Sequence, residues 1–471
     1  MQFLMDFMSS IASFLFSPLG IVCMIALGAF FITRAKASKF YESHGRDVHS
    51  LPFYNAAYVF LAILLPAIIV LIIYNLAAPA IYQSMIESKY QSHLATLSDF
   101  EKKNFINNVF ALTHGNITSK TSETITQASA YLNSLTQTGS TIKWLGALGL
   151  ALLFGGQAYR SVSPRLRARN RVEVIVKTIL IIFSILAILT TIGIVLSLVF
   201  ESLRFFQKVP VNEFLFGMHW SPQTSIRPGQ VSSEGSFGAI PLLAGTLLIT
   251  FIAMLVAGPI GLMSAIYLSD YASPKFRAVA KPLLEILAGI PTVVYGFFAA
   301  LTVAPLIRGW GEGIGLSVSS ESALAAGLVM GIMIIPLVSS LSDDVINAVP
   351  QAMRDGSYGL GATKSETIRQ VVLPAALPGI VSAMLLAISR AIGETMIVVM
   401  AAGLAANLTI NPLEAVTTVT VQIVTLLVGD QEFDSAKTLA AFALGLLLFI
   451  ITLTLNMIAL RVVQKYREQY E

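Results

Sequence analysis

Long apolar runs alternate with shorter polar stretches along this chain of 471 residues. Nine of the runs approach or exceed the roughly 20 apolar residues that an α-helix needs to cross a bilayer. They lie at about 11–33, 54–77, 144–159, 178–200, 239–268, 283–306, 322–341, 379–403 and 438–462. The pattern predicts an all-α polytopic membrane protein with nine spans, and only the shortest run, 144–159, is left open as a span.

The chain has two parts, and each contains a long polar interval. Residues 1–171 hold three runs and an insert at 79–142 that is rich in Ser, Thr, Gln and Asn. The spaced apolar residues of this insert predict helices on the outer face of the membrane, while its role is left open. Residues 172–471 hold six runs and a polar interval at 342–378. The predicted architecture is therefore a six-span domain preceded by a three-span extension.

Composition agrees with a membrane protein. Hydrophobic residues make up 55% of the chain, charged residues make up 12%, and the mean hydropathy of +0.76 is far outside the range of soluble domains. The one cysteine, Cys23, excludes an internal disulfide bond. The N-terminus lacks the basic segment of a cleaved signal, so the first run is predicted to remain in the protein.

Lysine and arginine collect in four polar segments, at 34–53, 160–177, 275–281 and 461–467. With nine spans, all four lie on one side of the membrane, and their positive charge marks that side as cytoplasmic. The N-terminus is then predicted to be periplasmic and the C-terminus cytoplasmic. The basic run at 164–171 is interpreted as an anchor to anionic membrane lipid, and no nucleic acid is expected as a partner.

The second polar interval carries the most specific pattern of the chain. Gly361 is placed to end a short helix in a left-handed conformation, which other residues adopt only at a cost. Thr363 or Ser365 is placed to cap a second helix over 364–372, and Pro374 is expected to end it. Two short helices joined at a glycine form a rigid projection to which a soluble partner can bind.

This interval resembles the coupling loop of ABC-importer permeases, whose pattern is Glu-Ala-Ala, three residues, Gly, nine residues, Ile, one residue, Leu-Pro. Gly361 matches the glycine, Val371 the isoleucine, and Leu373-Pro374 the closing pair. Asp355-Gly356-Ser357 replaces Glu-Ala-Ala, which keeps a carboxylate but adds a poor helix former. Whether this replacement weakens coupling is left open. The resemblance implies that these residues, with Ala362, contact a separate ATPase in the cytoplasm.

The chain has no motif of its own for nucleotide hydrolysis or metal chemistry. It lacks the G-x-x-x-x-G-K-S/T loop that cradles phosphates, and its five histidines show no metal-ligand spacing. No cofactor and no enzyme activity are therefore expected in this chain, and ATP with magnesium is expected on the partner ATPase.

Two charged residues fall inside the eighth run, which is predicted to form one helix over 379–403. Arg390 lies about 11 residues from its start, or roughly 16 Å, which is near the bilayer midplane. Glu394 is expected one turn further on the same face. A charge at that depth costs about 2.5–3.5 kcal/mol, so such a residue usually faces a partner or a water-filled cavity. This favours a position in a transport pathway, where Arg390 contacts an anion. The alternative is a mutual ion pair that only locks helix packing.

Two further charged residues lie near the ends of the sixth run, 283–306. Glu285 is near its cytoplasmic start, where a structural and a functional role are equally supported. Arg308 follows its outer end, where it either receives an anion from a binding protein or snorkels to the membrane surface. Both are kept as candidates for the substrate pathway beside Arg390 and Glu394.

The motif Arg390-Ala-Ile-Gly-Glu-Thr-Met396, at this distance from the coupling loop, is similar to phosphate-importer permeases of the PstC type. Three other segments share the resemblance: Val209–Pro222, Ile266–Ala272 and Leu284–Gly296. The resemblance covers about 172–471, and residues 1–171 look like the N-terminal extension of longer members. It implies import of inorganic phosphate across a bacterial inner membrane. It also implies a sister permease, a dimer of ATPase subunits and a periplasmic phosphate-binding protein as partners.

Three alternatives stay open. In the first, the cargo is another oxyanion, such as sulfate or molybdate. In the second, the chain is the sister permease. In the third, the chain is a membrane receptor that relays the occupancy of a binding protein without transport. A cation at depth favours transport, because a pure relay has no use for it. Whether two identical or two different permeases pair is also left open.

Overall fold

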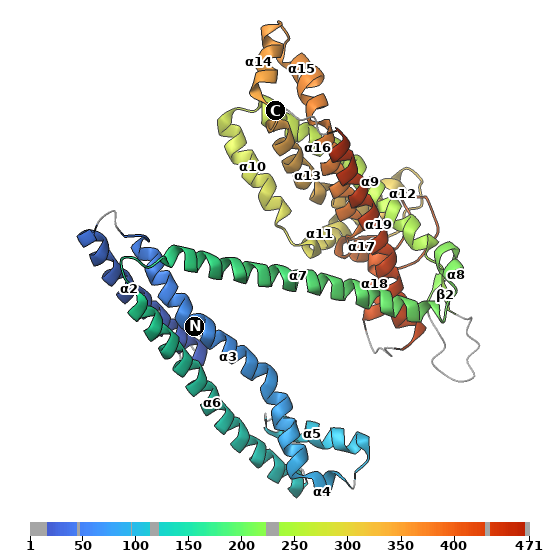
Figure 1. The fold of residues 1–471 in the computed structure, drawn as a ribbon. Helices are drawn as coiled ribbons and strands as arrows, with labels where there is room; N and C mark the ends of the chain where they lie inside the picture. Colours follow the sequence, from blue (N-terminus) through green and yellow to red (C-terminus); the bar gives the residue numbers. More distant parts are fainter. Residues whose placement is uncertain are drawn as a thin grey trace, which may run out of the picture. The chain divides into compact units, whose positions relative to one another are not determined.

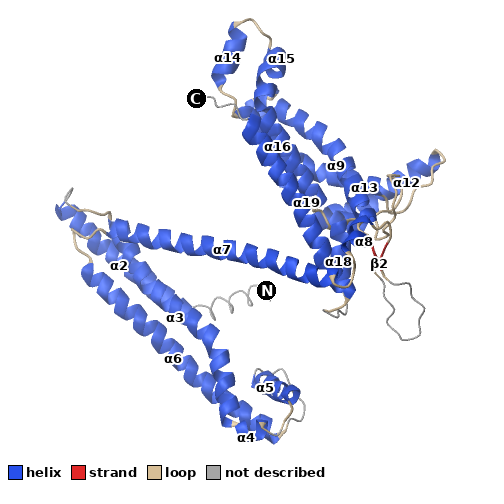
Figure 2. Ribbon diagram, turned by 45° about the vertical axis from the view of Figure 1, so that its right-hand side comes forward, coloured by secondary structure: helices blue, strands red, loops and turns tan. Residues whose placement is uncertain are grey.

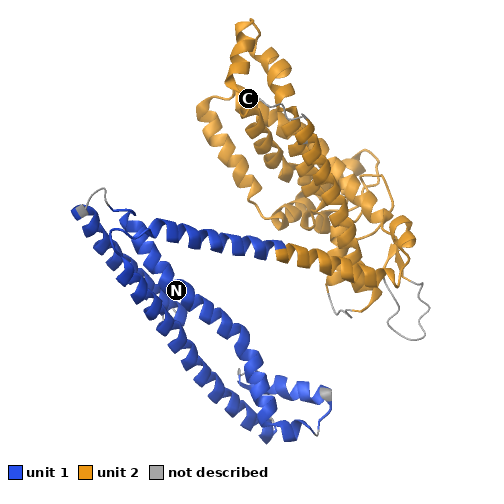
Figure 3. Cartoon of the chain, in the orientation of Figure 1, with its two compact units in different colours: residues 1–188 blue, residues 189–471 orange. Residues whose placement is uncertain are grey.

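The computed structural model describes residues 17–44, 48–95, 97–113, 122–222, 235–428 and 434–466. These segments are helical apart from loops and one two-stranded sheet (Figures 1 and 2). Nine helices of this described part are long and apolar enough to cross a membrane, as the hydrophobic pattern predicts. The chain divides into two compact units, residues 1–188 and 189–471 (Figure 3). The division falls inside helix α7, and the boundary at 171/172 stays a prediction.

Unit 1 contains three long helices that form a bundle. Its elements are α2 (Pro18–His44), α3 (Pro52–Lys89), α4 (Gln91–Leu94), α5 (Asp99–Thr113), α6 (Glu123–Ser161) and the first part of α7 (Ala168–Phe206). α2, α3 and α6 pack around fully buried small residues, among them Ala26, Ala67 and Ala151. Small side chains let the backbones of membrane helices approach closely, which accounts for the alanines along this core.

The described part of the insert at 79–142 is helical, as expected, and much of it continues the long helices. α3 extends to Lys89 and α6 begins at Glu123, so the uncertain third run belongs to a membrane-length helix of 39 residues. Between them, α5 packs on α6 around Phe105, Val109 and Leu132. This small separate core explains the spaced apolar residues of a polar segment.

Unit 2 contains the rest of α7 and the elements that follow it. They are α8 (Val211–Phe216), β1 (Trp220–Ser221), β2 (Ser236–Phe237), α9 (Ile240–Ile266), α10 (Pro274–Ala288), α11 (Thr292–Phe298), α12 (Ala304–Gly313), α13 (Ala323–Asn347), α14 (Gln351–Gly359), α15 (Lys364–Thr367), α16 (Leu373–Ile392), α17 (Met396–Ala401), α18 (Val419–Leu427) and α19 (Ala436–Tyr466). Short π-helical segments follow α9 (Tyr267–Tyr271) and connect α11 to α12 (Ala299–Val303) and α15 to α16 (Ile368–Val372). The strands pair antiparallel, with Trp220 opposite Phe237.

α13 lies at the centre of unit 2. In its most apolar stretch 61% of the residues are buried, more than in any other described span. It packs along α9 and against α16 around Ala253, Val329 and Ile334. A second core joins the end of α7 to the sheet, α18 and α19, and there Trp220 Nε1 donates to Gln422 Oε1 at 2.9 Å.

The sixth run at 283–306 is not one helix. α10 ends at Ala288, and the span is formed by α11, a π-helical segment and α12 over 292–313. Gly289, Ile290 and Pro291 separate α10 from α11, because a residue before proline is disfavoured in the helical conformation. Hydropathy alone does not show this break, but Pro291 and Gly289 within the apolar run do indicate a kinked or interrupted helix.

The eighth run at 379–403 differs from the prediction at both ends. Its helix begins in the coupling loop, since the chain is helical without a break from Lys364 to Ile392. The prediction that Pro374 ends a helix is therefore wrong. Pro374 stands in the first turn of α16, directly after a π-helical segment, and the first turn of a helix tolerates proline. At the other end the helix stops at Ile392, well before residue 403.

Candidate functional site

The coupling loop forms two short helices that meet at Gly361, as the sequence predicts. Gly361 has φ = +85°, in the left-handed region that favours glycine. Its N–H donates to Tyr358 O at 2.9 Å, and the Ala362 N–H donates to Ser357 O at 3.2 Å. This is the hydrogen-bond pattern of a Schellman cap, which satisfies the last carbonyls of α14.

Thr363 caps the second helix of the loop. Its Oγ1 accepts a hydrogen bond from the Glu366 N–H at 3.4 Å, and the Glu366 carboxylate accepts one from the Thr363 N–H at 2.8 Å. This reciprocal pair is a capping box, so Thr363 rather than Ser365 is the cap. The hydroxyls of Ser357 and Thr367 lie 2.9 Å apart and join the two helices. The loop is a fixed projection at one end of unit 2 (Figure 1).

Residues of the coupling-loop pattern differ in exposure. Asp355 and Gly356 are exposed on α14, which continues through both, and Asp355 accepts a hydrogen bond from Gln351 Nε2 at 2.9 Å. Val371 and Leu373 are half-buried at the base of the loop. Leu360, beside the glycine corner, is 92% exposed. An apolar side chain at the tip of a polar projection is available to a partner surface.

Arg354 anchors α14 to the rest of unit 2, a role that the sequence analysis missed. The residue is 8% exposed, and its guanidinium pairs with Asp270 in the π-helical segment after α9. It also donates to Ile346 O, near the end of α13, at 2.8 Å. Its partners Asp270 and Ile346 lie 84 and 8 residues away in the sequence, so the sequence shows only an isolated arginine next to the coupling-loop pattern.

A second buried acidic centre lies on α13, and it was also missed. Asp343 has a side chain that is 3% exposed; it accepts from Arg277 at 3.0 Å and from Lys281 at 2.9 Å, both on α10. The hydrogen bond to Asp343 raises the pKa of Lys281 above its usual range, against the opposing effect of burial. The ammonium group therefore stays charged near neutral pH. In the sequence, these two cations indicate only which side of the membrane is cytoplasmic.

Arg390 lies in the last turn of α16, two residues before the helix ends. Its side chain is exposed, and no acidic group within the described residues forms an ion pair with it. A cation is favourable at the C-terminal end of a helix, where carbonyl groups carry partial negative charge. Because the helix starts before residue 379, counting from there does not give a depth. The midplane position of Arg390 stays a prediction.

The prediction that Glu394 continues the helical face of Arg390 is wrong. Gly393 ends α16, and Glu394 lies in the break before α17 with 9% of its surface exposed. Its Oε1 accepts from the N–H groups of Met396 at 3.1 Å and Ile397 at 3.4 Å. A carboxylate at a helix N-terminus is stabilising, and Glu394, one residue before the N-cap Thr395, is held there by the first N–H groups of α17.

The two interrupted spans pack against each other. α11, which follows the break at 289–291, contacts α17, which follows the break at 393–395. Gly296 allows the close approach, because a Cβ added there would lie 2.7 Å from Met400 Sδ and 3.1 Å from Met396 O. The Tyr295 hydroxyl donates back across the first break to Leu287 O at 2.9 Å. Broken helices of this kind line substrate sites in several transporter folds.

The two remaining pathway candidates lie elsewhere. Glu285 is exposed on α10 and is not part of a span, which corrects its predicted place at the start of the sixth. Arg308 lies in α12, five residues before the end of the sixth span at Gly313, and its Nε is 2.8 Å from Glu312 Oε1 in an exposed pair. No hydrogen bond or ion pair joins any two of the four candidates within the described chain. The structure therefore does not assemble them into one cluster.

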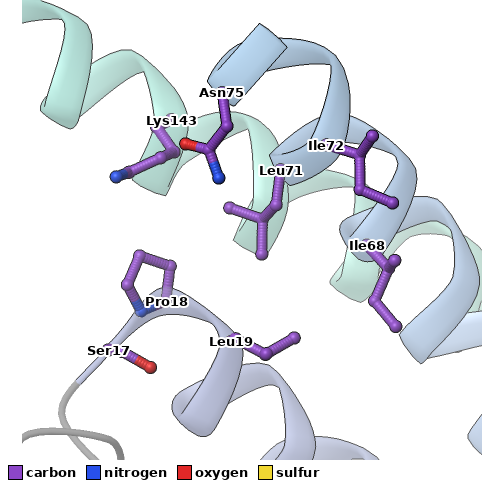
Figure 4. Close-up of a pocket in the computed structure, with 8 residues that line it drawn as sticks. All are labelled: Ser17, Pro18, Leu19, Ile68, Leu71, Ile72, Asn75 and Lys143. Atoms are coloured by element: carbon purple, nitrogen blue, oxygen red, sulfur yellow. The ribbon is translucent and has the colours of Figure 1, made fainter. Parts of the chain in front are cut away.

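Unit 1 holds a cavity of about 320 Å³ between α2, α3 and α6 (Figure 4). Leu19, Ile68, Leu71 and Ile72 give it a mainly aliphatic lining. Asn75 and Lys143 contribute polar groups, and the Lys143 ammonium also lies 5.3 Å from the Tyr74 ring centroid. The cavity shares no residue with the coupling loop or the pathway candidates.

A bundle of apolar spans with a capped coupling loop between two of them defines the class of ABC-importer permeases, and comparison with known families agrees. Residues 257–468 match the family described as binding-protein-dependent transport system inner membrane component. Residues 19–190 match the family described as phosphate ATP-binding cassette transporter. The extension thus has a family of its own, which the sequence motifs of residues 172–471 did not reveal.

The chain belongs to the family of phosphate transport system permeases. It is 33% identical to the phosphate transport system permease protein PstC of Mesorhizobium japonicum over 52% of this chain and 76% of the relative. The PstC of Haemophilus influenzae is 31% identical over 60% of this chain and 90% of the relative. A probable ABC transporter permease of Bacillus subtilis, YqgH, is 33% identical over 51% and 74%.

Proposed function

We propose that this chain is the permease subunit of an ATP-driven importer that moves inorganic phosphate across a bacterial inner membrane. The observation that carries the proposal is the unbroken helix of 29 residues from the coupling loop at Lys364 to Ile392. Because Arg390 lies in its last turn, a partner that displaces the loop displaces the arginine with it. Such a helix, roughly 43 Å long, connects the loop that binds the ATPase to Arg390, the cation that is proposed to contact the anion.

Phosphate is the proposed cargo for two reasons. The three relatives cited above are all named as permeases, one of an ABC transporter and two of phosphate transport systems. In addition, Arg390 presents an exposed planar guanidinium, which matches the geometry of an oxyanion better than a lysine does. We place Arg390 in the substrate pathway, with Glu394 holding the backbone beside it. Glu285 and Arg308 are weaker candidates, since Glu285 lies outside the spans and Arg308 already forms an exposed pair with Glu312.

The family implies an ATPase and a binding protein as partners. We further propose a sister permease and two ATPase subunits, with ATP and magnesium bound there and no cofactor or catalytic site in this chain. The coupling loop and the C-terminus then face the cytoplasm, while the N-terminus faces the periplasm. The family is one of inner-membrane components, and this orientation follows from the distribution of lysine and arginine.

The proposal is tested by reconstituting the complex in proteoliposomes and measuring uptake of radiolabelled phosphate. Uptake should need ATP and the loaded binding protein, should be competed by arsenate and should resist excess sulfate. A complex with an ATPase inactivated at its phosphate-binding lysine is the control. Preferential uptake of sulfate or molybdate would assign another oxyanion, and ATP hydrolysis that responds to the binding protein without any uptake would support a receptor.

A further inference from the structure

Four elements of unit 2 meet beneath the coupling loop through one continuous series of polar contacts. The elements are α10, α13, α14 and the π-helical segment Tyr267–Tyr271 at the end of α9. The coupling-loop pattern does not account for these contacts, since its residues lie between Asp355 and Pro374 and none of them takes part. We call the series, from Lys281 on α10 to Arg354 on α14, the polar network.

The first half of the polar network joins α10 to α13. Asp343 is almost fully buried and accepts from two cations of α10, Arg277 at 3.0 Å and Lys281 at 2.9 Å. Asn347, one turn further along α13, donates from Nδ2 to Asp343 Oδ1 at 2.8 Å. α10 leads directly into the break before α11, so this half holds the start of the interrupted sixth span.

The second half joins α13 to the coupling loop. Asn347 Oδ1 accepts from Ser269 Oγ at 3.2 Å, in the π-helical segment. The next residue, Asp270, pairs with Arg354 of α14, and the two side chains are only 7% and 10% exposed. Asn347 is therefore the single described side chain that bonds both halves.

We propose that the polar network positions the coupling loop for energy transfer: Arg354 and Asn347 tie the helix that the ATPase moves to α10, and through it to the interrupted sixth span. A buried ion pair adds little net stability, but removing one partner leaves an uncompensated charge, so the pair holds one fixed geometry. Packed elements held in one arrangement shift together rather than deform. The inference rests on the proposed function, since it assumes that a partner moves α14.

The decisive variant is Asn347→Ala in the full reconstituted complex. Asn347 is exposed, so the change removes the link between Asp343 and Ser269 without emptying the core. ATP hydrolysis should stay near the wild-type rate, while phosphate imported per ATP should fall by about two- to thirtyfold, the range of measured coupling changes. The matched control is Asn411→Ala, an exposed asparagine before α18 that bonds Glu414 at 2.9 Å, and it should leave the ratio unchanged.

Two results would overturn the inference. One is wild-type phosphate per ATP in Asn347→Ala; the other is an equal fall in hydrolysis and uptake, which a purely structural role predicts. Arg354→Lys provides a second test, because an ammonium keeps the charge but lacks the fork that reaches Asp270 and Ile346 O together; the ratio should again fall. If the wild-type complex imports no phosphate, the proposed function is contradicted and the polar network is not. The amount of the true cargo imported per ATP, compared between wild type and Asn347→Ala, then tests the network.

Discussion

At the scale of single residues, Gly361 sets the shape of the coupling loop through its backbone alone. A Cβ added there meets no atom within 4 Å, so any penalty comes from φ = +85° rather than from crowding. Gly361→Val should cost about 1–2 kcal/mol in the loop and reduce both ATPase co-purification and phosphate uptake. Gly361→Asn is the control, because asparagine accepts left-handed conformations more readily. Equal behaviour of the two variants would show that the turn is not needed for docking.

The nearby Gly356 gives the opposite expectation. It lies in helix α14 at an ordinary φ, and a Cβ added there also meets no atom within 4 Å. Gly356→Ala should therefore stabilise α14 by up to about 1 kcal/mol. Uptake and ATPase binding should be unchanged or improved, as measured by co-purification at limiting ATPase. A loss would mean that the ATPase surface needs the backbone of Gly356 uncovered.

Substitutions of Arg390 and Glu394 should have separate effects, because the two side chains do not form an ion pair in the structure. Arg390→Gln should lower uptake by about ten- to hundredfold, because this factor corresponds to the free energy of one hydrogen bond to a charged group. Assembly of the complex should stay intact. Adding Glu394→Gln should not restore uptake, since Glu394 bonds the backbone of α17. Arg308→Gln is the control and should change little if that side chain only reaches the membrane surface. Recovery of uptake in the double variant would instead support the ion-pair alternative.

The sequence predicted residues whose partners are local and missed those whose partners are remote. Gly361 and Thr363 act through backbone groups within five residues, so their roles follow from turn and cap chemistry. Arg354 and Asp343 are defined by partners on other helices, 84 and about 65 residues away, which one sequence cannot pair. Glu394 was misplaced because apolar residues lie on both sides of the break at 393–395, and the break brings its carboxylate to the first N–H groups of α17.

At the scale of elements, the contact between α11 and α17 is the closest approach of the two broken spans. Gly296→Ala should place a methyl group 3.1 Å from Met396 O and 2.7 Å from Met400 Sδ, and should cost about 1–3 kcal/mol. Adding Met400→Ala should restore part of the loss, since it removes the flexible neighbour but not the carbonyl. Gly309→Ala in α12, with open space at its Cβ, is the control. Unfolding temperatures of the purified complexes measure the effect, and equal temperatures for both alanine variants would contradict it.

Element boundaries were harder to predict than elements. Hydropathy located all nine runs, because each of these helices contains an apolar window of 18 residues with few charges. It placed the ends of the sixth and eighth spans wrongly, since hydropathy averaged over a run does not resolve breaks of three residues at 289–291 and 393–395. The signals that mark the true ends are single residues, Pro291 and Gly393, while Pro374 and Pro259 show that a proline also occurs inside a continuous helical stretch.

At the scale of the whole molecule, the extension and the permease domain are separable by sequence. The relative from Haemophilus influenzae is covered over 90% of its length by 60% of this chain, so a permease of that family is largely complete without the remainder. Residues 19–190 match a family described with phosphate ATP-binding cassette transporters. The extension is therefore expected to modify a phosphate importer rather than to carry the pathway.

A shortened chain tests this expectation. A chain that starts at Ala168 keeps helix α7 whole but loses the contacts of Arg169 N–H with Ser50 Oγ at 3.2 Å and of Arg171 with the Tyr58 hydroxyl at 2.9 Å. Both contacts lie at the start of α7, so the chain should insert, assemble with its partners and retain phosphate uptake per ATP. Residues 1–167 supplied as a separate chain are the control and should not change that ratio. If the shortened chain assembles normally but imports nothing, and the separate piece restores import, the extension takes part in transport itself.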